Sequence, residues 1–287
     1  MKNSSQNHSK KEQIIKTPYK LVTREWQSEN TIIPIGQFLM GNKKIGVIAG
    51  PCAVESREQI IETAHIVKEA GAIALRGGAY KARTSPYSFR GYGEKALHWL
   101  IEAKEATGLP IVTEVLDTDS LPLICEYADI LQVGTRNMQN FSLLEKLAKC
   151  QKPILLKRGM YSTLEEFLLA AEYLVYGGNA QVILCERGIR TFTQHNRNTF
   201  DVGIIPVLKA ESHLPVIADP SHAVGDWRYI TAIARSAIAV GADGLLIEVH
   251  PDPEYALSDG QQSLKPKVFQ QLMKEISRIA EAIDRSI

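Results

Sequence analysis

Short apolar runs alternate with longer stretches of helical periodicity along the chain from residue 45 onward. The runs are continuously apolar, which is typical of strands buried on both faces of a sheet. Eight such runs predict strands at Ile45–Ala49, Ala72–Leu75, Ile111–Thr113, Ile130–Val133, Ile154–Leu156, Val182–Leu184, Val216–Ala218 and Gly244–Glu248. The stretches between them predict helices that include Arg57–Ala70, Glu94–Thr107, Ser120–Tyr127, Ser142–Cys150, Leu164–Tyr176 and Trp227–Val240, with a final helix over Pro266–Ile283.

Glycine and proline mark the boundaries of these elements. Gly71 and Gly108 follow predicted helices, and Pro110 and Pro153 precede predicted strands. Strands and helices that alternate at this spacing indicate a parallel sheet. Eight units close a barrel, whereas a doubly wound open sheet usually has fewer strands. We therefore predict an α/β fold, a (β/α)8 TIM barrel, with an open sheet as the alternative.

The N-terminal part of the chain does not follow this alternation. Residues 1–16 are polar and rich in Lys, Ser and Asn, so we expect a disordered tail there. Residues 17–44 form an extension in which two β-like runs, Thr31–Ile35 and Gln37–Met40, flank Gly36. This pattern predicts a short β-hairpin that caps the main domain. Residues 45–287 then form the barrel, where we expect any catalytic site.

Composition excludes several classes of protein. The chain has 287 residues, with 33 Lys plus Arg against 32 Asp plus Glu, and a formal net charge of +1. Without a basic block a nucleic-acid partner is not expected, because such binding needs many cations to neutralise phosphates. No apolar stretch spans a bilayer and the N-terminus has no apolar signal core, so we expect no membrane association and a cytoplasmic location.

Cationic residues follow many of the predicted strands. In a parallel barrel the carboxyl ends of the strands meet at one mouth, where active sites lie. The cations expected at this mouth are Arg76, Lys81, Arg83, Arg136, Lys157 and Arg187. So many cations in a nearly neutral chain indicate that anions bind there, and phosphates and carboxylates are the natural ligands. For any one of them alone, a solvated loop charge is the alternative.

A second group at the same mouth has the chemistry of a metal site. Cys52, His222, Glu248 and Asp259 follow the first, seventh and eighth predicted strands, which become neighbours when the barrel closes. A thiolate, an imidazole and two carboxylates suit a borderline divalent ion such as Mn²⁺, Fe²⁺, Co²⁺ or Zn²⁺. Two alternatives stay open from the residues alone. Cys52 could be a small buried hydrophobic residue, and His222 could cap a helix.

The other cysteine residues are expected to be structural. Cys125 and Cys150 fall within predicted helices, and Cys185 follows a strand, where core packing is the simpler interpretation. The four cysteines contain no CxxC pair, so neither a disulfide framework nor a zinc knuckle is predicted.

Six segments at these positions resemble 3-deoxy-D-arabino-heptulosonate 7-phosphate (DAHP) synthases. They are AGPCAVES at 49–56, KARTSPYSF at 81–89, LLKRG at 155–159, CERG at 185–188, DPSH at 219–222 and IEVHP at 247–251. The resemblance is strongest to the short bacterial group related to 3-deoxy-D-manno-octulosonate 8-phosphate synthases, and it covers about residues 30–285.

The resemblance implies a (β/α)8 enzyme, usually a homotetramer, that condenses phosphoenolpyruvate with erythrose 4-phosphate and releases phosphate, the first step of aromatic biosynthesis. It implies a divalent metal, most simply Mn²⁺, on Cys52, His222, Glu248 and Asp259. It assigns phosphoenolpyruvate to Arg76, Lys81, Arg136, Lys157 and Arg187, and the phosphate of the aldehyde substrate to Arg83 and Thr84. We further expect Lys81, with its pKa lowered by the surrounding cations, to deliver a proton to the aldehyde oxygen, or else to act only as a charge clamp.

One departure from the family pattern concerns the aldehyde. The usual Lys-Pro-Arg-Thr reads Lys81-Ala82-Arg83-Thr84 here, and alanine loosens the loop because proline would fix φ. The sister family uses arabinose 5-phosphate and carries an extra Asn before its Arg. Since that Asn is missing here, erythrose 4-phosphate is favoured, with the octulosonate synthase as the alternative. A non-catalytic binder of phosphorylated metabolites is a third alternative, and an intact metal tetrad argues against it.

The length of the N-terminal segment bears on feedback regulation. Relatives often carry an N-terminal domain that senses aromatic end products, and the roughly 44 residues before the first predicted barrel strand are too few for one. We therefore expect a catalytic core that Phe and Tyr do not inhibit. The N-terminal tail is long enough to dock a separate regulatory partner.

Overall fold

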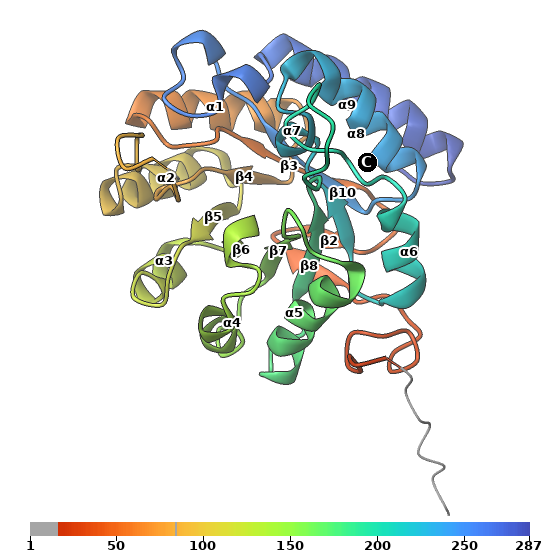
Figure 1. Cartoon of the computed structure of the whole chain (residues 1–287). Helices are drawn as coiled ribbons and strands as arrows, with labels where there is room; N and C mark the ends of the chain where they lie inside the picture. The colour runs from red at the N-terminus through yellow and green to blue at the C-terminus, as the bar shows by residue number, and fades with distance from the viewer. Residues whose placement is uncertain (1–16, 84) are drawn as a thin grey trace, which may run out of the picture.

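The computed structural model describes residues 17–83 and 85–287 and shows a closed barrel of eight parallel strands within an outer ring of helices (Figure 1). The strands follow one another around the barrel in chain order, and the last pairs with the first. They are β3 (Gly46–Gly50), β4 (Ala74–Arg76), β5 (Ile111–Val115), β6 (Ile130–Val133), β7 (Ile154–Lys157), β8 (Val182–Glu186), β9 (Val216–Ala218) and β10 (Gly244–Glu248). The predicted barrel is confirmed. The expected tail over residues 1–16 and the expected substrate contact Thr84 lie outside the described residues.

The helices follow the predicted pattern with small shifts. They are α1 (Arg57–Glu69), α2 (Glu94–Thr107), α3 (Leu121–Tyr127), α4 (Phe141–Leu147), α5 (Leu164–Tyr176), α6 (Ile204–Glu211), α7 (Pro220–Val224), α8 (Trp227–Ala239) and α9 (Pro266–Ala282), with short 3-10 turns η1 (Thr135–Asn137), η2 (Pro253–Tyr255) and η3 (Gly260–Gln262). Among the described residues, no helix combines the length and the apolar character needed to span a bilayer.

Local hydrogen bonds explain where several helices begin. Ser56 caps α1 by accepting from the backbone N–H of Gln59 at 3.0 Å. At the start of α5, the Thr163 hydroxyl accepts from the N–H of Glu166, and the Glu166 carboxylate accepts from the N–H of Thr163. Such caps satisfy N–H groups that the first helical turn leaves without partners.

The prediction for α4 was wrong at its C-terminal end. The helix ends at Leu147, so Cys150 lies in the following turn, where its N–H donates to the Leu147 carbonyl. Two short helices, α6 and α7, were not singled out by the pattern because each has a proline in its first turn. Proline is tolerated there, since the first N–H groups of a helix have no partner within the helix.

The N-terminal residues form the predicted hairpin, which closes one end of the barrel. Strands β1 (Ile33–Ile35) and β2 (Phe38–Met40) pair antiparallel around Gly36. The buried side chains of Ile33, Ile35 and Met40 join the core layer inside the barrel. This layer contains Ile48, Ala74, Val112, Ile130, Leu155, Ile183, Ile217 and Leu246. Met40 contacts the first residues of β3 and β10, so the hairpin plugs the amino end of the barrel and leaves the carboxyl end for ligands.

Replacing Met40 with alanine tests this plug. We expect the free energy of unfolding to fall by about 2–5 kcal/mol, because the side chain is completely buried and its loss opens a cavity. Leu39→Ala is the matched control, since Leu39 is adjacent and 45% exposed, and should change stability by less than about 0.5 kcal/mol. Urea unfolding measures both. Equal losses in the free energy of unfolding for the two substitutions would contradict the role of Met40 in closing the barrel.

Candidate active site

The carboxyl ends of the strands surround a polar cavity of about 320 Å³. The predicted site residues that line it are Arg76, Lys81, Arg83, Arg136, Lys157, Arg187, His222 and Asp259. Cys52 and Glu248 are buried beside Asp259. The barrel therefore brings all of the described predicted residues to one place, although they come from segments more than 200 positions apart in the sequence.

Three of the four predicted metal ligands form a tight group. The Cys52 sulfur and one carboxylate oxygen each from Glu248 and Asp259 lie within 4.8 Å of one another. Glu248 Oε1 is buried and accepts no hydrogen bond among the described residues, although Arg76 Nη2 lies 3.0 Å from it as an ion pair. A thiol beside two carboxylate oxygens, one of them buried and short of donors, fits a divalent cation.

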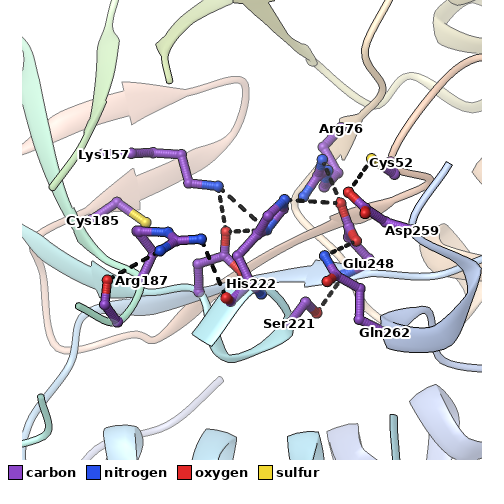
Figure 2. Close-up of polar contacts among 12 residues, drawn as sticks. Cys52, Arg76, Lys157, Cys185, Arg187, Ser221, His222, Glu248, Asp259 and Gln262 are labelled. Carbon is purple, nitrogen blue, oxygen red and sulfur yellow. Dashed lines mark hydrogen bonds and ion pairs between the residues drawn. The ribbon is translucent and has the colours of Figure 1, made fainter. Parts of the chain in front are cut away.

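His222 lies at the edge of this group, between it and the cations (Figure 2). Its Nε2 is 3.4 Å from Glu248 Oε1, and its Nδ1 is 2.7 Å from Asp219 Oδ2. A carboxylate can only accept, so we assign the imidazole proton to Nδ1, which leaves the Nε2 lone pair facing the cluster. Burial lowers the pKa of His222 and favours the neutral ring that metals bind.

Burial and charge set opposite protonation states for two of the clustered groups. Burial, and then Glu248, raise the pKa of the Cys52 thiol to about 12. The thiol lies 3.2 Å from Asp259 Oδ2 and 3.0 Å from the Ser258 hydroxyl. Although burial opposes it, His222 and Arg197 hold the pKa of Asp259 well below its ordinary value. A cation at this position would favour the Cys52 thiolate, because it supplies the positive charge that the buried sulfur lacks.

On the other side of His222 lies a group of cations with unused donors. Figure 2 shows Lys157 and Arg187 there, whereas Arg76 is drawn above Glu248, on the side of the cluster. Lys157 pairs with Asp219, and Arg187 donates to the carbonyls of Gly188 and His222. The Nε and Nη1 of Arg76 and the Nε of Arg187 are buried without partners among the described residues. Buried donors of this kind are suited to an anion that completes their hydrogen bonds.

Lys81 differs from its prediction. Its Nζ donates to the Cys52 carbonyl at 3.1 Å. Burial lowers its pKa, but Cys52 and Glu114 outweigh burial and the surrounding cations, so the pKa of Lys81 is raised. The expected lowering was wrong because the sequence does not show that Glu114, at the end of β5, faces this lysine.

The site can now be compared with known proteins. Residues 22–285 match the DAHP synthetase I family. The chain belongs to this family. The resemblance carried by the six motifs is thereby confirmed.

Two kinds of relative accompany the family match. A phospho-2-dehydro-3-deoxyheptonate aldolase from Thermotoga maritima is 54% identical over 266 residues, which are 93% of this chain and 79% of that protein. A 2-dehydro-3-deoxyphosphooctonate aldolase from Nitratidesulfovibrio vulgaris (strain DP4) is 33% identical over 251 residues, 81% of this chain and 91% of that one.

Solved structures give the same result for the fold. The crystal structure of the T. maritima DAHP synthase superposes with a TM-score of 0.92 at 52% identity and covers 95% of this chain and 80% of its own. A truncated form of that enzyme gives a TM-score of 0.88 at 49% identity, covering 93% of this chain and 98% of its own.

A buried carboxylate positions the loop that carries Arg187 in this member of the DAHP synthetase I family. Glu186, at the end of β8, accepts from the Gly188 N–H at 2.6 Å and from Arg158 Nη1 at 3.0 Å. Arg158 also pairs with Asp201 at 2.9 Å. Arg158 and Glu186 belong to the LLKRG and CERG segments, but the sequence gave them no role, because their pairing across β7 and β8 is a tertiary contact.

A second carboxylate holds the loop that carries Asp259. Glu55 Oε1 accepts from the Leu257 N–H at 2.9 Å, and Glu55 Oε2 lies 3.3 Å from His250 Nε2. His250 Nδ1 accepts from the Asp252 N–H at 3.0 Å. Because Glu55 is three residues after Cys52 and Leu257 is two before Asp259, these bonds bring the two clustered groups together.

Asp219 is another residue to which the sequence gave no role, and substituting it tests the site. An asparagine at position 219 keeps an oxygen that accepts from the backbone N–H of His222 at the start of α7. It lacks the negative charge that attracts the proton on the imidazole Nδ1 of His222. We expect Asp219→Asn to weaken Mn²⁺ binding by about 10–100-fold, measured by calorimetric titration.

Asp226→Asn is the matched control for this experiment. Asp226 likewise begins a helix, α8, but pairs with the exposed Arg228. Its substitution should leave Mn²⁺ affinity unchanged. Unaltered Mn²⁺ affinity in Asp219→Asn would contradict the orienting role of Asp219.

Proposed function

We propose that this chain condenses phosphoenolpyruvate with D-erythrose 4-phosphate and releases phosphate, as a metal-dependent 3-deoxy-7-phosphoheptulonate synthase at the start of the shikimate pathway. The observation that carries the proposal is the cavity, where cations with unused donors lie beside a thiol–carboxylate cluster. The relative named as a heptonate aldolase is 54% identical, against 33% for the octonate aldolase from N. vulgaris, which supports the four-carbon aldehyde.

The cation group would hold phosphoenolpyruvate. Arg76, Lys81, Arg136, Lys157 and Arg187 all line the cavity, and this substrate carries both a carboxylate and a phosphate. The unused donors of Arg76 and Arg187 would become satisfied when the substrate binds. Charge-assisted hydrogen bonds would hold the phosphate while water adds at C2 and the C–O bond breaks.

The phosphate of the aldehyde substrate is assigned to the loop of Arg83 and Thr84. The Arg83 Nε donates to the Phe89 carbonyl at 2.8 Å, and its Nη2 donates to the Ser258 hydroxyl. The guanidinium therefore has a defined place at the cavity edge. Two anchored phosphates would align C3 of phosphoenolpyruvate with the aldehyde carbon, and positioning of this kind can supply up to roughly 7–11 kcal/mol of the barrier.

The metal in this proposal is held by Cys52, His222, Glu248 and Asp259. The borderline donor set favours Mn²⁺, with Fe²⁺, Co²⁺ or Zn²⁺ as alternatives. When bound, the ion would act as a Lewis acid on the aldehyde carbonyl. Its second-sphere support comes from Asp219, which orients His222, and from Glu55, which holds the loop of Asp259.

Lys81 lines the same cavity as the residues assigned to the two substrates. Its raised pKa keeps the ammonium protonated at neutral pH, which supports the charge-clamp role beside the aldehyde oxygen. A newly formed alkoxide is a much stronger base than an amine, so a proton can still pass from Nζ to that oxygen. Both roles need the cation at the same position.

Three further statements belong to this proposal. The chain acts in the cytoplasm, assembles as a homotetramer, and takes any feedback control from a separate partner protein. They rest on the family resemblance and on the composition of the chain.

The proposed reaction is tested by phosphate release from phosphoenolpyruvate after chelator treatment of the purified chain. We expect release with erythrose 4-phosphate that depends on added Mn²⁺, and at most weak release with arabinose 5-phosphate. A preference for the five-carbon sugar would assign the chain to the octulosonate reaction. Phosphate release that does not depend on added Mn²⁺ would refute the metal tetrad.

Substituting Lys81 separates chemistry from metal binding. We expect Lys81→Met to lower kcat by at least about 100-fold while Mn²⁺ content stays normal, because Nζ bonds the Cys52 carbonyl and not the clustered oxygens or sulfur. Cys52→Ala should lose metal and activity together. Lys95→Met, an exposed lysine on α2, is the control and should behave like the unaltered chain. Normal turnover in Lys81→Met would remove both roles of this lysine.

A further inference from the structure

Two cysteine residues that the proposed reaction does not use lie in contact. Cys125 belongs to α3, and Cys150 lies in the turn after α4. Their sulfur atoms are 3.3 Å apart, and both residues are half-buried. The sequence predicted structural roles for each and no pairing, since 24 residues separate them (125 to 150).

The backbone on each side of this thiol pair is held in place. Lys152 Nζ donates to the carbonyls of Cys125 and Ala128 at the C-terminal end of α3. Asn179, which is buried, donates from Nδ2 to the carbonyls of Cys150 at 2.7 Å and Lys152 at 2.9 Å. These hydrogen bonds to the backbone keep the two cysteines in positions where their sulfur atoms face each other.

We propose that Cys125 and Cys150 form a reversible disulfide when the chain meets a small-molecule disulfide such as oxidised glutathione. A disulfide bond is about 2.05 Å long, so the sulfurs need to approach by only about 1.2 Å. Both cysteines lie in the outer helical layer and are partly exposed to solvent.

The disulfide would form by two successive thiol–disulfide exchange steps. One protein thiolate attacks the small disulfide, forms a mixed disulfide and releases one thiol. The second cysteine loses its proton, attacks the protein sulfur and releases the second thiol. Two protein thiols are thereby oxidised by two electrons, and one small disulfide is reduced to two thiols.

The environment suggests the order of attack. Burial, and next the hydrogen bond to Cys150, raise the pKa of the Cys125 thiol to about 12. Cys125 is therefore protonated at neutral pH and is a poor first nucleophile. The first attack falls to Cys150, after which Cys125 is already in contact with the sulfur that it must attack.

The disulfide would act on stability and not on the candidate active site. It would link the C-terminal part of α3, just before β6, to the turn just before β7, and so enclose β6, η1 and α4. Both attachment points precede the amino ends of their strands, whereas Arg136 follows the carboxyl end of β6. The crosslink therefore lies at the end of the barrel opposite the cavity.

Oxidised glutathione and intact-mass measurement test the proposal on the full metal-loaded chain. We expect the mass to fall by two hydrogen atoms, peptide mapping to join Cys125 to Cys150, and dithiothreitol to reverse the change. Cys125→Ser and Cys150→Ser are the matched variants. Cys125→Ser should retain a glutathione adduct on Cys150, whereas Cys150→Ser should form little adduct, because the protonated Cys125 thiol is a poor first nucleophile. Stable adducts on the unaltered chain, a link through Cys52 or Cys185, or no reaction would each overturn the proposal.

Thermal unfolding of the same samples tests the stabilising effect. The oxidised chain should melt about 5–10 °C above the reduced chain, because the crosslink restricts the unfolded state. A variant with both Cys125→Ser and Cys150→Ser should show no such shift on oxidation. An unchanged midpoint in a chain shown to contain the crosslink would refute this effect. Neither measurement depends on the proposed condensation reaction.

Discussion

Three buried ion pairs at the carboxyl end of the barrel are the constraint on which the site depends. Arg76 pairs with Glu248, Lys157 with Asp219, and Arg158 with Glu186. Buried charges are costly unless they are paired, and removing one partner typically costs about 3–5 kcal/mol. Each pair joins two different strand ends, so the same contacts that neutralise the charges also fix the positions of the loops around the cavity.

Charge pairing also divides the donor atoms of these cations into two groups. Carboxylates occupy some of the donors of Arg76, Lys157 and Arg158, whereas the inner donors of Arg76 and Arg187 remain without partners among the described residues. A site with every cation neutralised would bind anions weakly, and a site with none neutralised would be unstable. The cavity lies between these limits, and the hairpin plug at the opposite end of the barrel leaves this mouth as its binding face.

Much of this arrangement could be predicted from the sequence, and most of the failures have a common cause. The eight strands were predictable because each is buried on both faces, and their carboxyl ends had to converge once the barrel closed. Partners across the barrel were not predictable. The pairing of Asp219 with Lys157, the raised pKa of Lys81 beside Glu114, and the contact of Cys125 with Cys150 all depend on tertiary neighbours. Local pattern was misleading where a proline lies in the first turn of a helix, as in α6 and α7.

For the proposed reaction, the choice between the two aldehydes depends on how Arg83, the residue assigned to the substrate phosphate, is placed relative to the clustered thiol and carboxylates. Ser258 connects these regions, since its hydroxyl lies 3.0 Å from the Cys52 sulfur and accepts from Arg83. Ser258 also directly precedes Asp259, so one short segment carries a clustered carboxylate and the contact to the arginine. Ser258 therefore ties the position of the Arg83 guanidinium to that of the clustered thiol and carboxylate. The proposed phosphate anchor cannot shift without breaking a hydrogen bond to the segment that carries Asp259.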